Sequence, residues 1–189
     1  MLRFQRGVSM LEVLIAIVVL TIGLLGVAQL QFRMQAAELE AYQRTQAIVL
    51  LQDMVDRINA NRKNAAAYAT AVPLGTASTI DCSSPATLAL RDQCDWHAAL
   101  LGRNETRAGA QLGAMNGARG CVANPVTTMP RQVIVAVAWQ GLTPTAAPGA
   151  TACGQGAFGA DDRFRRAMVA SVTIGCLQND PSTGACVTP

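Results

Sequence analysis

The chain has 189 residues, a formal net charge of +3, 51% hydrophobic residues and 14% charged residues. This length is enough for one ordinary domain and a membrane anchor, and the scarcity of charge fits a membrane segment attached to a soluble part. Because the net charge is small, it gives no whole-protein argument for binding a nucleic acid or an acidic substrate.

A long apolar run follows the first seven residues. No residue from 13 to 31 is charged, and with the mostly apolar residues 8–11 the run reaches the length of about 20 residues that a helix needs to span a bilayer. Arg3 and Arg6 precede the run and only Arg33 follows closely, so the positive-inside rule places the N-terminus in the cytoplasm. A cleaved signal peptide fits poorly, because the run is too long and no A-x-A-like site follows it.

The helical pattern continues beyond the apolar run, since neither Pro nor Gly interrupts residues 27–61. Apolar positions recur there at helical spacing: Ile48, Leu51, Val55 and Ile58 form a stripe flanked by Leu50 and Met54. We therefore expect one helix over residues 8–62, apolar on all sides in its first half and on one face in its second. Gly23 and Gly26 are interpreted as close-packing positions of this helix.

The start of the chain resembles the prepilin processing motif, which is a short basic leader ending in Gly, four mostly apolar residues, Glu and an apolar helix. Here Gly7 is followed by VSMLEVL at residues 8–14. Type IV pilins and type II secretion pseudopilins share this motif. TIGLLGVAQLQ at residues 21–31 and YQRTQAIVLLQDMVDRINANRKNAAAY at residues 42–68 are further similar to PilV-type minor type IV pilins. This likeness covers about the first third of the chain.

The resemblance implies an α+β, type IV pilin-like fold, with a long N-terminal helix packed on a small antiparallel sheet. It also implies that prepilin peptidase cuts between Gly7 and Val8 and methylates the new amine of Val8. The implied regions are a leader (1–7), a transmembrane and assembly segment (8–32), an amphipathic segment (33–64) and a periplasmic head (65–189). The chain would pass once through the bacterial inner membrane before it enters a pilus.

The same resemblance implies a structural protein without enzymatic activity or cofactor. Its expected partners are prepilin peptidase, other minor pilins, the major pilin and the inner-membrane assembly machinery. Two alternatives stay open, a type II secretion minor pseudopilin and a signal-anchored periplasmic binding domain.

Glu12 is the expected assembly residue, because it lies four positions, or about one helical turn, after Val8. After cleavage, the amine of Val8 would be a cation in an apolar bundle, which is unfavourable unless the amine is paired. The carboxylate of Glu12 on a neighbouring helix is a suitable partner. Two other interpretations stay open: Glu12 lies at the level of the lipid headgroups, or it pairs with the amine of its own chain.

The pattern after residue 64 predicts an α+β head. Residues 65–79 are expected to form a loop, and residues 85–101 a helix capped by Ser84, with helical character resuming to about residue 112. Strands are expected at 120–126, 132–139 and 167–176, separated by a long loop at 141–158. Val133, Val135, Val137 and Trp139 should lie on one side of the middle strand.

All six cysteines lie after the apolar run: Cys82, Cys94, Cys121, Cys153, Cys176 and Cys186. Their even number, their wide spacing and the absence of a CxxC motif favour disulfides in an oxidising compartment over a zinc site. An antiparallel meander is compatible with the pairs Cys121–Cys153 and Cys176–Cys186. The remaining pair, Cys82–Cys94, requires a helix that starts later than residue 85; otherwise the connectivity differs.

Other candidate sites are weaker. His97, the only histidine, has no nearby nucleophile signature and is interpreted as structural or exposed. The spacing of two aspartate pairs matches no calcium-ligand pattern, so we expect no metal: Asp92 with Asp95, and Asp161 with Asp162. Arg163, Arg165 and Arg166 form a small basic cluster, but Phe164 alone is a poor stacking platform, so nucleic-acid binding is not expected.

Overall fold

The computed structural model describes residues 9–103, 106–107, 110–111, 115–126, 128, 130–183 and 186–188. The expected cleavage and methylation site, Gly7 and Val8, lies outside the described residues. The chain divides into a helical unit that ends at Ala41 and a globular unit that begins at Tyr42. The expected α+β, pilin-like fold is confirmed, since a long N-terminal helix precedes a small antiparallel sheet with disulfides.

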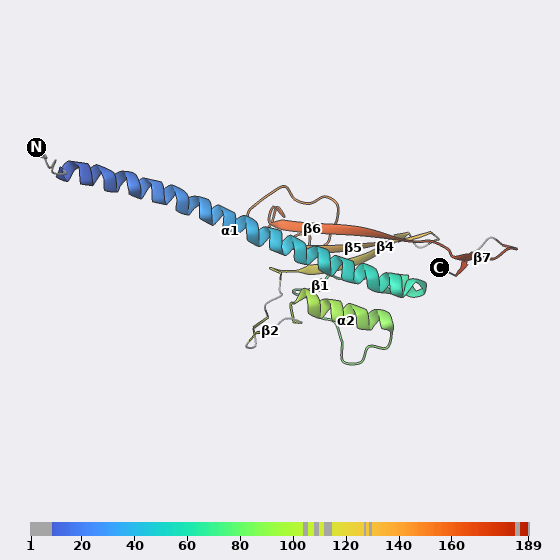
Figure 1. Cartoon of the computed structure of the whole chain (residues 1–189). Coiled ribbons are helices and arrows are strands. Elements are labelled where there is room, and N and C mark those ends of the chain that lie inside the picture. The colour runs from blue at the N-terminus through green and yellow to red at the C-terminus, as the bar shows by residue number, and fades with distance from the viewer. Residues whose placement is uncertain are drawn as a thin grey trace, which may run out of the picture. The chain divides into compact units, whose positions relative to one another are not determined.

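Helix α1 (Met10–Ala60; blue to cyan in Figure 1) agrees with the helix expected over residues 8–62. Ser9 caps its start, because Ser9 Oγ accepts a hydrogen bond from Leu11 N at 3.3 Å and the Ser9 carbonyl accepts one from Glu12 N at 3.0 Å. These contacts satisfy backbone donors that lack partners at a helix N-terminus. By its length and composition α1 could cross a membrane, and its most apolar stretch is not buried within the chain.

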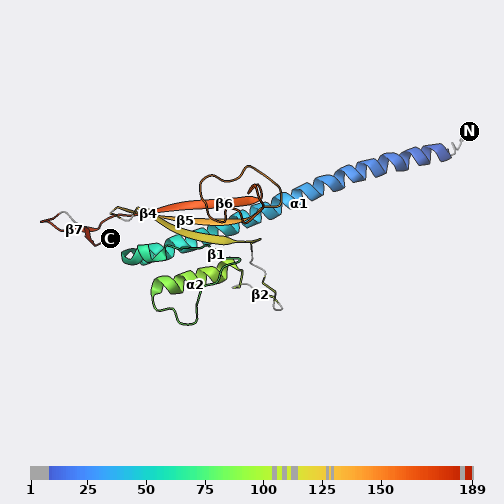
Figure 2. The same cartoon turned by 180° about the vertical axis from the view of Figure 1, so that it is seen from behind.

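The globular unit contains a four-stranded antiparallel sheet in the order β1-β4-β5-β6. Its strands are β1 (Leu74–Gly75), β4 (Arg119–Val126), β5 (Arg131–Gln140) and β6 (Arg165–Ile174). Helix α2 (Leu88–Leu100) lies beside the second half of α1 in both views of the molecule (Figures 1 and 2). Both helices and one face of the sheet contribute to a single hydrophobic core.

Strand β5 is covered on both faces. Its valines and tryptophan lie on the helix side as expected, with Val133, Val135 and Val137 fully buried and Trp139 nearly so. The opposite face carries Ala136 and Ala138, which pack in a second cluster with Cys153 and Phe158 of the segment after β5. Small side chains on this face leave room for that segment, which explains why the strand reads as a continuous apolar run.

The buried stripe of α1 differs from the expected one. It consists of Ala47, Leu50, Leu51, Met54 and Ile58. Ile48 is 36% exposed and Val55 is only partly buried. The apolar face is turned toward Leu50 because α1 packs against α2 as well as the sheet: the indole Nε1 of the fully buried Trp96 donates to Leu50 O at 2.8 Å.

Two predictions around α2 were wrong. Residues 65–79 are not simply a loop, because the 3-10 helix η1 (Arg62–Tyr68) buries Ala65 and Tyr68, and β1 follows. Helix α2 begins at Leu88 with Thr87 as its N-cap, not Ser84, and Thr87 Oγ1 accepts a hydrogen bond from Leu90 N at 3.2 Å. The 3-10 helix carries no apolar repeat, so its burial was not visible in the sequence.

Helical character does not resume after α2 in the residues that are described. Gly102 ends the helix with a φ of +68°, and Arg103 N donates back to Ala98 O at 3.0 Å, an arrangement typical of helix C-termini. Two short antiparallel strands then follow, β2 (Thr106–Arg107) and β3 (Ala110–Gln111). A second short hairpin, β7 (Gln178–Asn179) with β8 (Cys186–Thr188), follows the end of β6.

The cysteines form three disulfides, Cys82–Cys94, Cys121–Cys153 and Cys176–Cys186, with Cα–Cα distances of 5.7, 5.8 and 5.6 Å. The first pair is compatible with α2 because this helix starts six residues after Cys82. The second attaches the segment after β5 to strand β4, and the third closes the β7–β8 hairpin.

Candidate functional site

Glu12 lies in the first turn of α1 with its side chain exposed. A carboxylate at this position is favoured by the partial positive charge of a helix N-terminus. Among the residues that the structure describes, no hydrogen bond or ion pair to the Glu12 side chain is found. Its expected partner, the amine of Val8, is outside the described residues. The position of Glu12 is therefore compatible with a partner on another chain, and its assembly role stays a prediction.

The apolar side chains around Glu12 are exposed on all sides of α1. Leu14 is 61% exposed, Val18 47% and Leu25 70%, although such residues are usually buried in soluble proteins. Apart from its chain neighbours and the nearby backbone of α1 itself, no atom of the described chain lies within 4 Å of a Cβ placed on Gly23 or Gly26, so this chain's own packing does not require glycine there. A surface of this kind needs lipid or other apolar helices to cover it.

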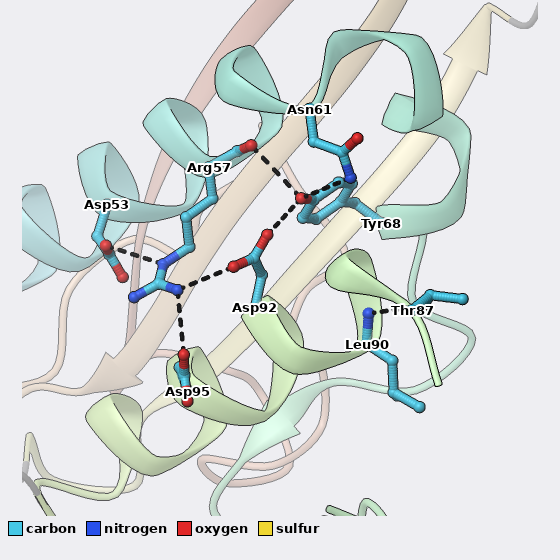
Figure 3. Close-up of polar contacts among 8 residues, drawn as sticks. All are labelled: Asp53, Arg57, Asn61, Tyr68, Thr87, Leu90, Asp92 and Asp95. Atoms are coloured by element: carbon cyan, nitrogen blue, oxygen red, sulfur yellow. Dashed lines mark hydrogen bonds and ion pairs between the residues drawn. The ribbon is translucent and has the colours of Figure 1, made fainter. Parts of the chain in front are cut away.

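A polar cluster connects α1, η1 and α2 within the globular unit (Figure 3). Its members, which we call the Arg57 cluster, are Asp53, Arg57, Asn61, Tyr68, Asp92 and Asp95. Arg57 Nε lies 3.0 Å from Asp53 Oδ1, one turn earlier on α1. Arg57 Nη1 lies 3.1 Å from Asp92 Oδ1 and 3.3 Å from Asp95 Oδ2, both on α2. One guanidinium thus binds carboxylates from two helices.

Tyr68 connects η1 to the same cluster. Its hydroxyl donates a short hydrogen bond to Asp92 Oδ2 and accepts one from Asn61 Nδ2 at 3.2 Å. The Tyr68 side chain is fully buried and Asp92 is 8% exposed. Burial and the hydrogen bond to Asp92 raise the pKa of Tyr68 to about 12. Burial alone would lower the pKa of Arg57, but its contacts with Asp53 and Asp92 more than offset this effect and raise it.

This arrangement is a structural link rather than a metal site. Asp92 and Asp95 point toward Arg57 (Figure 3), so their charges are compensated by a cation of the protein itself. Throughout the described part of the chain, no group of three or more His, Cys, Asp or Glu residues could hold a metal ion. Sequence reasoning did not identify Arg57 or Tyr68, although the i, i+4 spacing of Asp53 and Arg57 is a signal for a helical ion pair.

His97 is buried beside β1, with 7% of its surface exposed. Its Nδ1 accepts a hydrogen bond from the backbone N–H of Gly75 at 3.0 Å, so this nitrogen carries no proton. Burial, with a smaller effect from the charge of Arg103, lowers the pKa of His97. The neutral imidazole thus holds β1 against α2, in agreement with a structural interpretation.

The arginines around Phe164 do not form one exposed basic surface. Arg165 is 3% exposed, and its guanidinium lies 3.2 Å from Asp162 Oδ2 and donates to the carbonyls of Thr151 and Pro148 at 2.7 and 2.9 Å. It therefore holds the segment after β5 in place. Of the other two, Arg163 is exposed, and Arg166 donates to Thr143 O at 2.7 Å.

Comparison with known protein families finds two matches, which together cover about the first half of the chain. Residues 29–97 match the Tt1218-like family, described as Type IV pilin Tt1218, and residues 2–28 match the prokaryotic N-terminal methylation motif. No curated protein and no solved structure matches the chain significantly. The pilin match extends into α2 and includes every member of the Arg57 cluster. About the first half of the chain is therefore similar to a type IV pilin behind an N-terminal methylation motif, and the fold is α+β and pilin-like.

Proposed function

We propose that this chain is a minor pilin of the PilV type, a non-enzymatic subunit that promotes the assembly of a type IV pilus. The observation that carries the proposal is the exposed apolar surface of α1 with Glu12 in its first turn, in a chain that matches both a type IV pilin and the methylation motif. The minor, PilV-type role is supported by the similarity of residues 21–31 and 42–68 to such pilins.

The proposed mechanism starts with a membrane-anchored precursor whose head lies in the periplasm. Prepilin peptidase removes residues 1–7 and methylates the amine of Val8. The inner-membrane assembly machinery then moves the chain into a fibre, where α1 packs against the helices of other minor pilins and the major pilin. In this apolar environment the Val8 amine is a costly cation, and Glu12 of a neighbouring subunit neutralises it and fixes the axial register.

Replacing Glu12 tests this mechanism. The Glu12→Leu variant should still be cleaved and inserted, because its helix becomes more apolar. It should be depleted from sheared pili, because the amine of its partner lacks a carboxylate. Immunoblots of membrane and pilus fractions measure both steps. Glu38→Leu is the matched control, since Glu38 is also exposed on α1 but lies far from the N-terminus. Normal incorporation of Glu12→Leu would remove the pairing role.

The alternative membership in a type II secretion system needs a separate test, because both systems use the same processing motif. Chemical crosslinking of the full chain in cells that contain both systems, followed by mass spectrometry of the captured proteins, separates them. We expect type IV pilins among the crosslinked partners. Capture of pseudopilins alone would assign the chain to the secretion system.

A further inference from the structure

One edge of the four-stranded sheet is closed by residues 70–76, which we call the edge segment. Both residues of β1, which lies within it, pair with the start of β4. On either side of β1, Thr70 N donates to Val122 O at 2.9 Å and Thr76 N donates to Ala118 O at 2.8 Å. A strand of two residues forms few such bonds, so the position of the edge segment also depends on what lies on its other side.

His97 of α2 supports the edge segment on the side away from β4. The backbone N–H of Gly75 points to α2, where it donates to His97 Nδ1 at 3.0 Å. Gly75 and His97 are both buried, so this N–H would be a costly unpaired donor without the imidazole. Nδ1 accepts the bond only in the neutral ring, in which the other nitrogen, Nε2, carries the proton. The support therefore depends on the protonation state of His97.

Protonation of His97 removes this support because of where the proton binds. The free lone pair of the neutral ring is on Nδ1, the atom that accepts the bond from Gly75. A proton on Nδ1 would place two N–H donors opposite each other and would leave a cation in a buried position, and both are unfavourable. His97 can therefore take up a proton only when α2 and the edge segment separate.

The charged groups around His97 do not favour its protonation in the closed arrangement. Burial lowers the pKa of His97, and the charge of Arg103 in the turn after α2 lowers it further. The two residues of β1 are uncharged, and the charged residue of β4 beside them, Arg119, is another cation. Asp81 in the loop before α2 is exposed and accepts hydrogen bonds from a serine of its own loop, while the aspartates of α2 bind Arg57. No carboxylate of the described chain thus stabilises the protonated ring.

We propose that His97 is an acid-sensitive support of the edge segment: when it binds a proton, the segment separates from α2 and uncovers the outer edge of β4. An uncovered edge presents backbone N–H and C=O groups with which an extended segment of another protein can pair. The contribution of the support is fully present above pH 6.5, the ordinary pKa of histidine, and is lost as the pH falls below it. The proposal stands whether or not the chain enters a pilus.

Hydrogen exchange of the Gly75 amide, measured by NMR on the ¹⁵N-labelled full chain in detergent micelles, tests the proposal. The ratio of the intrinsic to the observed exchange rate should fall about tenfold for each pH unit below 6.5, because opening takes up one proton. The amides of β5, in the middle of the sheet, should keep their protection. His97 is the only histidine, so its ring ¹⁵N signals report directly whether Nδ1 is free of a proton at neutral pH.

His97→Gln is the matched variant, because a glutamine side chain can accept the Gly75 N–H through its carbonyl oxygen but does not titrate. Protection of Gly75 in this variant should not change between neutral pH and about pH 5. If the variant fails to fold, the unaltered chain still decides the matter. Protection of Gly75 that is independent of pH in the unaltered chain, an equal loss in β5, the same loss in His97→Gln, or a proton on Nδ1 at neutral pH would each overturn the proposal.

Discussion

The carboxylates around Arg57 differ mainly in their exposure to solvent. The side chain of Asp92 is 11% exposed, whereas those of Asp53 and Asp95 are 36% and 58% exposed. Surface ion pairs contribute little to stability, but a nearly buried carboxylate that loses its charge leaves its donors poorly satisfied. Asp92 also accepts the Tyr68 hydroxyl, so it is the residue that joins η1 and α2 to α1.

Asp92→Asn should lower the free energy of unfolding by about 1–3 kcal/mol, because a charge-assisted bond becomes a neutral one in a buried position. The measurement is urea unfolding of the full chain in micelles, followed by tryptophan fluorescence. Asp95→Asn is the matched control on the same helix and should cost less than about 1 kcal/mol. Equal losses of unfolding free energy in the two variants would show that the burial of an aspartate does not determine how much it contributes to stability.

The raised pKa of Tyr68 makes the globular unit sensitive to alkaline pH. The ordinary pKa of 10.0 is raised to about 12 in the folded chain. The stabilising contribution of the neutral hydroxyl is therefore fully present below pH 10 and is lost as the pH rises toward 12. Tyr42→Phe leaves Tyr68 as the only tyrosine, so the absorbance of tyrosinate reports it directly. We expect a midpoint near pH 12, and a midpoint near 10 would contradict the buried hydrogen bond.

At the scale of elements, the contact between α2 and the sheet depends on a close approach at Gly120 of β4. A Cβ at this position would lie 2.7 Å from Leu100 Cδ1 and closer still to the ring of Trp96. Both side chains are buried in the core, so neither has room to move away. Glycine is needed there for packing.

Gly120→Ala should therefore destabilise the globular unit by about 1–3 kcal/mol, the usual range for overpacking a core. Thermal unfolding followed by near-ultraviolet circular dichroism would measure the loss and report on the packing of Trp96. Gly149→Ala provides the comparison, because nothing lies within 4 Å of its added Cβ. If both variants melt together with the unaltered chain, the close packing of α2 on β4 is not present in solution.

The elements with a strong local signal could be predicted from the sequence. Strands β5 and β6 and helix α1 have β-branched or apolar patterns, and each lies within a few residues of its expected bounds. Strand β4 also lies close to its expected bounds, although its pattern is weaker and includes Pro125. The remaining strands, β1, β2, β3, β7 and β8, have two or three residues each, so they depend on tertiary contacts and have no periodicity to detect. Ser84 was the expected N-cap, but the cap is Thr87, a residue of the same capping type, and only the fold selects between them.

Candidate site residues were also predictable to different degrees, because some have a local signal in the sequence and others depend on tertiary contacts. Glu12 stands out because a carboxylate in an apolar run is visible in the sequence alone. The Arg57 cluster joins residues 35 and 38 positions apart, from Arg57 to Asp92 and to Asp95, so it depends on how two helices pack.

At the scale of the whole molecule, the two units have opposite surface character. The helical unit exposes large apolar side chains along its length, whereas the globular unit has its own core and three disulfides. If the chain were a soluble monomer, the contact of these apolar side chains of the helical unit with water would be strongly unfavourable. The helical unit therefore needs an apolar cover, which in the proposed mechanism is first lipid and then the helices of other subunits.

Mass spectrometry of the N-terminal peptide tests whether the chain is a processed pilin, as we propose. The protein should be isolated from pili and membranes of cells that contain prepilin peptidase, and from cells that lack it. We expect a peptide that begins at Val8 with a methylated amine when the peptidase is present, and an uncut chain when it is absent. A chain that keeps Gly7 and the residues before it in cells with active peptidase would contradict the proposed processing.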